Sequence, residues 1–219
     1  MMGQVLVSLL WQATLETLNM VIAGTILATL LGLPLGIILS TTGPNQILEH
    51  PLVHRICGGF VNIGRSIPFI ILMVAIIPFT RFVVGTSIGT IAAIVPLTVA
   101  AIPFVARLVD GALKEVDAGV IEAAESMGAS PLEIIYKVMI PEALPALVLA
   151  ITLTAVNLVG YSAMAGSIGG GGLGDLAIRY GYQRFRGDIM LATVVILVVM
   201  VQGIQMLGDA IARKLDHRN

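Results

Sequence analysis

The residues whose types and spacing could support metal binding, catalysis or phosphate binding are histidines, acidic residues and a run of glycines. His50 and His54 stand four residues apart, the spacing of two metal ligands on one helical face. Pro51 disfavours a helix that begins before it, and Glu49 alone stands nearby as a third ligand. No nucleophile–base pair and no pair of carboxylates is recognisable. The sequence therefore predicts no metal site and no catalytic residues, so we expect the chain not to be an enzyme.

The stretch GSIGGGGLG at residues 166–174 is rich in glycine, as phosphate-binding loops are. Such loops follow the pattern GxxxxGK[ST], in which the lysine reaches the phosphates, and no lysine follows these glycines. We expect a closely packed, non-helical turn instead, because glycine adopts backbone conformations closed to other residues. The chain is predicted not to bind ATP and to need no cofactor of its own.

The composition identifies the environment in which these residues act. Of the 219 residues, 57% are hydrophobic and 11% charged, and the mean hydropathy is +0.99. Soluble domains carry about 25% charged residues. The chain is therefore predicted to be an all-α integral membrane protein, with lipid as a partner. Its net charge of −1 gives no indication of nucleic-acid binding.

Long apolar runs indicate about five membrane-spanning helices within a single domain over residues 1–219. A helix needs about 20 apolar residues to cross a bilayer. Residues 58–79 are a span only if Arg65 lies near a helix end, where its long side chain reaches the headgroups. The spans are expected at 17–40, 58–79, 82–106, 146–168 and 188–210.

The distribution of lysine and arginine predicts the orientation. Residues 1–16 contain neither, whereas the C-terminal ARKLDHRN contains three, so we expect the N-terminus outside and the C-terminus in the cytosol. Eight basic residues then lie on the cytosolic side and four outside. The cytosolic set is Arg55, Arg65, Arg107, Lys114, Lys137, Arg213, Lys214 and Arg218.

The largest cytosolic segment, residues 107–142, is predicted to hold two short helices. Asp117 is typical of an N-cap, and Gly128 of the left-handed residue after a helix end. Ser130, Pro131 and Glu133 form a capping-box pattern for the second helix, which we expect to end near Pro141.

Three polar residues cluster inside the fourth span: Asn157, Tyr161 and Ser162. Polar side chains in spans either hydrogen-bond to neighbouring helices or line a pathway, and the sequence leaves both open. Ionisable residues are nearly absent from the spans, which argues against an ion-coupled secondary transporter. An intramembrane enzyme would need a nucleophile–base pair or metal ligands, and neither is found.

The central segment also carries a spaced pattern, in which Glu122-Ala123-Ala124 is followed by Gly128 and, nine residues later, by Val138-Met139-Ile140-Pro141. It resembles the cytosolic signature E-A-A, three residues, G, nine residues, I-x-L-P of ATP-binding-cassette importer permeases, with Val for Ile and Ile for Leu. The stretches RSIPFIIL, AAIVPLTVAAIPFVAR and LVGYSAMAGSIGGGGLG extend the likeness to the methionine-importer permeases over nearly the whole chain.

This resemblance implies a function, partners and sites. It implies a homodimer with the pathway on its two-fold axis, two ATPase subunits that bind ATP and Mg²⁺, an outer methionine-binding lipoprotein, and import of L- and D-methionine across a bacterial inner membrane. Glu122, Ala123, Ala124, Gly128 and Pro141 would couple the chain to the ATPase. Met164 would be the gate, with Tyr161, Ser162 and Asn157 in the pathway. A same-class permease for another amino acid or small solute is the nearest alternative.

Overall fold

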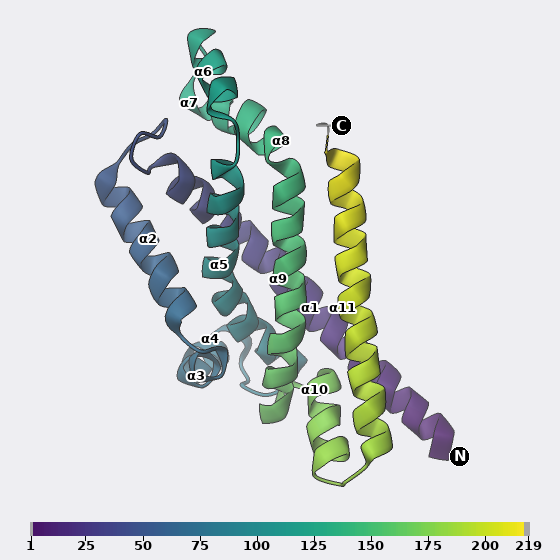
Figure 1. Cartoon of the computed structure of the whole chain (residues 1–219). Helices are drawn as coiled ribbons and strands as arrows, with labels where there is room; N and C mark the ends of the chain where they lie inside the picture. Colours follow the sequence, from purple (N-terminus) through teal and green to yellow (C-terminus); the bar gives the residue numbers. More distant parts are fainter. Residues whose placement is uncertain (1, 217–219) are drawn as a thin grey trace.

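The described part of the chain is built from helices throughout. A computed structural model describes residues 2–216, with side chains from residue 6 onward. Five long helices run between the two ends of the molecule (Figure 1). They are α1 (Met2–Thr41), α2 (Pro51–Ser66), α5 (Thr90–Lys114), α9 (Leu144–Ala165) and α11 (Gly187–Leu215). The predicted all-α fold class is confirmed.

Shorter helical segments gather at the two ends. At the end that holds the C-terminus lie α6 (Ala118–Ser126), α7 (Pro131–Glu133), the π-helical η1 (Ile134–Met139) and α8 (Ile140–Glu142). At the opposite end lie α3 (Phe69–Ala75), α4 (Ile77–Val84), η2 (Gly166–Gly170), α10 (Gly172–Leu176) and η3 (Ala177–Tyr182). The described chain begins at this second end (Figure 1). The predicted orientation requires the two ends of the chain to be separated in this way. Arg218, counted in that prediction, lies outside the described residues.

Four helical stretches of the described chain are long and apolar enough to cross a membrane, and the bent pair α2–α3 makes a fifth if it counts as one span. The four are Leu6–Thr41, Thr90–Lys114, Leu144–Gly170 and Gly187–Leu215. The third predicted span, 82–106, is shifted: α4 ends at the left-handed Gly85 (φ 77°), and α5 begins at Thr90.

The prediction of one continuous helix over 58–79 is wrong. Helix α2 ends at Ser66, and α3 leaves it at an angle of 101°. Ile67 between them is extended (φ −87°, ψ 122°), because the ring of Pro68 disfavours the helical conformation in the residue before it. Arg65 therefore lies at the end of α2 away from residues 107–142, the coupling segment, and not at the same end as that segment, as its assignment to one common side predicted (Figure 1).

A row of small residues on α1 brings this helix close to α5. Ala28 is fully buried, and a Cβ atom added at Gly32 would lie 2.8 Å from the carbonyl oxygen of Ile102. At Gly36 it would lie 2.6 Å from Cβ of Val109. Small residues four apart allow helix backbones to approach closely, which is the main source of helix association in lipid. The row comprises Gly24, Ala28, Gly32, Gly36 and Ser40.

We predict that Gly36→Ala lowers the free energy of unfolding by about 1–3 kcal/mol, the usual cost of overpacking. The added methyl group has no room against Val109 and the carbonyl oxygen of Ala106. The midpoint of thermal unfolding in detergent measures this effect.

Gly203→Ala in α11 is the matched control, because no atom lies within 4 Å of an added Cβ there. Alanine is favoured over glycine in a helix by roughly 1 kcal/mol, so the control should not lower the midpoint. Equal midpoints for the two variants would contradict the close contact between α1 and α5.

Candidate functional site

Helix α6, the first half of the predicted coupling segment, is capped as its sequence predicts. Oδ1 of Asp117 accepts a hydrogen bond from the backbone N–H of Gly119 at 2.7 Å. Gly128 follows the helix in the left-handed conformation (φ 81°), and its N–H donates to the carbonyl oxygen of Glu125 at 2.9 Å. Both ends of α6 are therefore fixed by local interactions.

The second half begins with the predicted capping box. The backbone N–H of Ser130 donates to Oε2 of Glu133 at 3.1 Å, and its hydroxyl donates to the same oxygen at 2.8 Å. Lys137 donates to Oε1 of Glu133 at 2.9 Å. The hydrogen bond from Lys137, and then those from Ser130, lower the pKa of Glu133 to about 2. Glu133 is therefore charged at physiological pH, and this N-terminus keeps its cap.

The second helix ends near Pro141, as predicted, because α8 ends at Glu142 and α9 begins at Leu144. Helical structure continues through η1 and α8, and only a turn at Ala143 separates it from α9. Pro141 and Pro145 each fall in the first turn of a new segment, where a backbone N–H is not needed. The coupling segment therefore passes almost directly into a long membrane helix.

The residues of the E-A-A pattern divide between two surfaces. Glu122 and Ala123 are exposed, as are Gly128 and Pro141. Ala124 is buried in the main apolar core, in which Ile134 and Met139 of η1 also lie. Glu122 and Ala123 are therefore available to a partner, whereas Ala124 serves the packing of α6 against the rest of the chain.

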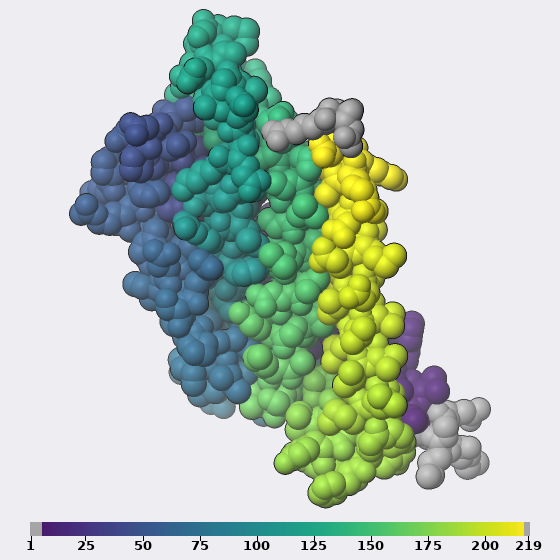
Figure 2. All heavy atoms as spheres, viewed as in Figure 1, coloured from purple at the N-terminus to yellow at the C-terminus, as the bar shows by residue number. Residues whose placement is uncertain are grey.

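Apolar side chains beside Glu122 were not predicted as site residues. Met127 is 82% exposed, Leu132 73% and Tyr136 64%. They lie in the teal region of α6 to η1 that protrudes at one end of the molecule (Figure 2). Large apolar side chains exposed on a protruding element are available for contact with a partner. In the sequence these residues cannot be told from the buried apolar positions of short amphipathic helices. Their exposure depends on how the helices pack, which no local pattern shows.

A buried carboxylate is paired within α5, near the end from which the coupling segment emerges. Asp110 is only 2% exposed, and it lies 3.0 Å from the guanidinium of Arg107 and 2.8 Å from the ammonium of Lys114. A buried charge is tolerated when it is paired in this way. Sequence analysis counted Arg107 and Lys114 only as topology signals and missed this cluster.

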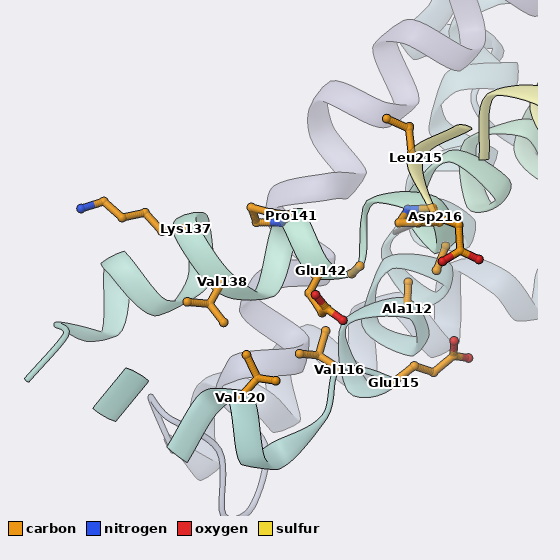
Figure 3. A pocket seen from close by; sticks show the side chains of 13 residues that line it. Ala112, Glu115, Val116, Val120, Lys137, Val138, Pro141, Glu142, Leu215 and Asp216 are labelled. Carbon is orange, nitrogen blue, oxygen red and sulfur yellow. The ribbon is translucent and has the colours of Figure 1, made fainter. Parts of the chain in front are cut away.

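A cavity of about 520 Å³ lies behind the coupling segment. Val116 just after α5, Glu142 at the end of α8 and Asp216 just after α11 approach it from three sides (Figure 3). The coupling segment is thus attached to the bundle through α5 and α9. The space between these two attachments is a cavity that side chains do not fill.

The polar residues of α9 do not share one environment. Asn157 and Tyr161 line a second cavity, of about 210 Å³, on the inner face of the bundle. The ring of Tyr161 stacks on Phe69 with centroids 4.5 Å apart. Ser162 is buried instead, and its hydroxyl donates to the carbonyl oxygen of Val159 at 2.8 Å, so it belongs to helix packing here. Met164 is 47% exposed.

The glycine-rich stretch matches the predicted non-helical turn only in part, because most of it is helical in η2 and α10. The helical path is broken at Ile168 and Gly169, and again at the two glycines that follow Gly170. Gly171 and Gly172 adopt positive φ values of 78° and 77°. Oε2 of Glu16 accepts a hydrogen bond from the N–H of Gly172 at 2.8 Å, and the hydroxyl oxygen of Thr17 accepts one from Leu173 at 2.9 Å. Helix α1 therefore holds the turn just beyond Met164.

The two histidines have structural partners. Nδ1 of His50 accepts from the N–H of Val53 and caps α2, and Nδ1 of His54 lies 3.1 Å from the carbonyl oxygen of Leu39. Within residues 2–216, no group of three potential ligands could hold a metal ion.

Membrane-length helices with a projecting, capped helical element at one end define a multi-span membrane protein that presents a docking element. Residues 32–219 match the family described as binding-protein-dependent transport system inner membrane component. The chain belongs to this family. The family resemblance and the prediction of a membrane transport subunit are confirmed.

Individual relatives are similar along nearly their whole length. The probable D-methionine transport system permease protein MetI of Vibrio cholerae is 59% identical over 210 residues, which cover 96% of this chain and 93% of the relative. The methionine import system permease protein MetP of Bacillus subtilis is 46% identical, with coverage of 95% and 94%. A solved structure of the MetNI methionine ABC transporter in an inward-facing conformation superposes with a TM-score of 0.93 at 49% identity, covering 99% of this chain and 98% of that one.

We predict that Gly128→Ala loosens the coupling segment. A residue with a Cβ atom costs about 1–2 kcal/mol in the left-handed conformation. Such a cost should speed amide hydrogen exchange of residues 118–130 by roughly 5- to 30-fold, as followed by mass spectrometry. Gly111→Ala is the control, because Gly111 is helical and an added Cβ meets nothing within 4 Å. Equal exchange in both variants would mean that the cap does not hold α6.

Proposed function

We propose that the chain is the permease subunit of an ATP-driven importer and forms the transmembrane pathway for methionine, in both L and D forms. The exposed Glu122–Ala123 surface on a helix capped at both ends carries the proposal, because it offers a rigid element through which an external ATPase can move the bundle. The names of the relatives from Vibrio cholerae and Bacillus subtilis support methionine as the solute.

The working assembly is a homodimer in the bacterial inner membrane. Two ATPase subunits, which bind ATP and Mg²⁺, dock at the end formed by α6 and α7, and this end faces the cytosol together with the C-terminus. A methionine-binding lipoprotein docks at the opposite, outer end, near α3, α4 and α10. The apolar surface of Met127, Leu132 and Tyr136 supports the cytosolic docking, since a partner would remove it from water.

Transport proceeds by alternating access. ATP binding draws the two ATPase subunits together, and α6 moves with them as a rigid body. Because the coupling segment leads through a single turn into α9, its displacement tilts the helix that carries Asn157, Tyr161 and Met164. Met164 closes the pathway in the resting state. Its flexible, polarizable side chain suits a contact that packs and repacks.

ATP-dependent uptake of labelled methionine into proteoliposomes tests this function. The vesicles contain the chain, its ATPase and the outer binding protein, and we expect uptake to vanish without either partner. Glu122→Lys reverses the charge of the docking surface and should reduce uptake by roughly tenfold or more, as loss of a charged interface contact does. Glu115→Lys is the control, since this exposed residue lies at the end of α5 outside the docking surface. ATP hydrolysis without methionine uptake would show that methionine is not the solute. Equal uptake by both variants would show that Glu122 does not belong to the coupling surface.

Met164→Ala is predicted to make the resting complex leaky. The shorter side chain no longer fills the closed pathway, so efflux of a small fluorescent solute should rise several-fold in the absence of ATP. Met206→Ala removes a more exposed methionine, 69% against 47%, from α11 and should leave efflux unchanged. If efflux from the Met164→Ala complex stayed as low as from the unmodified complex, the gate would have to lie elsewhere.

A further inference from the structure

The 210 Å³ cavity lies deep within the membrane-spanning part of the molecule. Three helices that reach the coupling end give its depth independently. At a helical rise of about 1.5 Å per residue, Arg65 of α2, Ala100 of α5 and Asn157 of α9 each lie about 20 Å from that end. A hydrocarbon core about 30 Å thick therefore surrounds the cavity. Its volume is below the range of about 300–1,000 Å³ for drug-sized ligands, which suits a small solute.

Arg65 at this cavity has no partner for its charge. Within the described residues it forms no ion pair and no side-chain hydrogen bond, although it lines the cavity and is exposed. Three other arginines, Arg107, Arg179 and Arg186, each form an ion pair with an aspartate. An unpaired arginine at this depth costs about 2.5–3.5 kcal/mol by insertion scales. Such residues face a water-filled cavity and mark a ligand pathway.

The backbone next to Arg65 is also unusual for this depth. Ile67 is extended and Pro68 breaks the helix, so α2 ends with carbonyl groups that have no helical partner. Irregular backbone at membrane depth is tolerated only where it is buried in protein or lines a water-filled cavity. Ile67 lines the same cavity as Arg65, so two independent features point to a hydrated site at this place.

We propose that this cavity binds the transported amino acid through its α-carboxylate, with Arg65 as the anion-binding residue. This inference rests on the proposed import of an amino acid. The guanidinium offers the planar pair of donors that matches a carboxylate. Asn157 also lines the cavity and supplies an amide, and the rings of Phe104 and Tyr161 supply an aromatic surface for the apolar remainder of the solute. A thioether makes favourable contacts with aromatic rings, so methionine fits this combination.

Thiol protection tests the site without any transport step. Cys57 is the only cysteine, so Cys57→Ser yields a background in which Ala100→Cys places one thiol in the cavity wall. The full chain is placed alone in nanodiscs and labelled with a small methanethiosulfonate reagent. At a methionine concentration ten times the dissociation constant, labelling should slow roughly tenfold. Methioninol, which lacks the carboxylate, should give little protection, and Arg65→Gln should abolish the protection by methionine.

Arg55→Gln is the matched control, because Arg55 lies on the same helix near its cytosolic start and does not line the cavity. Its protection by methionine should equal that of the parent chain, and Arg65→Lys should retain part of it. Equal protection by methioninol and methionine, or full protection in Arg65→Gln, would overturn the site. The same holds if methionine protects none of the variants. Uptake by the unmodified chain decides the proposed function separately, so failure of either proposal is recognised on its own.

Discussion

The close approach of α1 to α5 is the contact on which the other parts of the structure depend. Lipid provides no hydrophobic force between helices, so association relies on fit, and the small residues of α1 provide it. Helix α5, held in this way, is the central support for α2. A Cβ atom at Gly64 would lie 2.8 Å from Cγ of Pro103, so only glycine lets α2 reach this depth on α5. That contact places Arg65 beside Ala100 and Phe104, at the cavity.

Several hydroxyls in the bundle are satisfied within their own helices, but not all of them are. Four buried hydroxyls have no partner among the described residues: those of Thr25, Thr29, Ser40 and Thr98. Hydroxyls of Thr152, Thr154 and Thr193 donate to carbonyl oxygens four residues earlier, at 2.8–3.0 Å. Such bonds let a polar side chain lie in a membrane helix without a partner helix. The guanidinium of Arg65 forms no such hydrogen bond and no ion pair within the described chain. The fold therefore carries one large electrostatic cost at a place where the backbone is also broken, and sites of this kind are where function is expected to outweigh stability.

Sequence reasoning succeeded where the determining interactions are local and failed where they join distant residues. The caps at Asp117 and Ser130 depend on atoms within three residues, and both were predicted correctly. The break before Pro68 was missed, because residues 58–79 have the length of one span and were treated as a single helix despite the proline within them. The bond from Glu16 to Gly172 spans 156 residues, so no local pattern indicates it. Burial of Ala124, and exposure of Met127 three residues later, likewise depend on how α6 packs on η1.

On the proposed function, the arrangement of the coupling segment explains how one short helix can act on a distant pathway. Its two attachments differ: α5 is packed closely against α1, whereas α9 follows α8 after the single turn at Ala143. The 520 Å³ cavity between them leaves room for the segment to shift relative to α5. A displacement of α6 is therefore taken up by α9, the less restrained of the two. On the proposed function, this helix carries the cavity wall and the gate together, so binding and closure are moved by one rigid element.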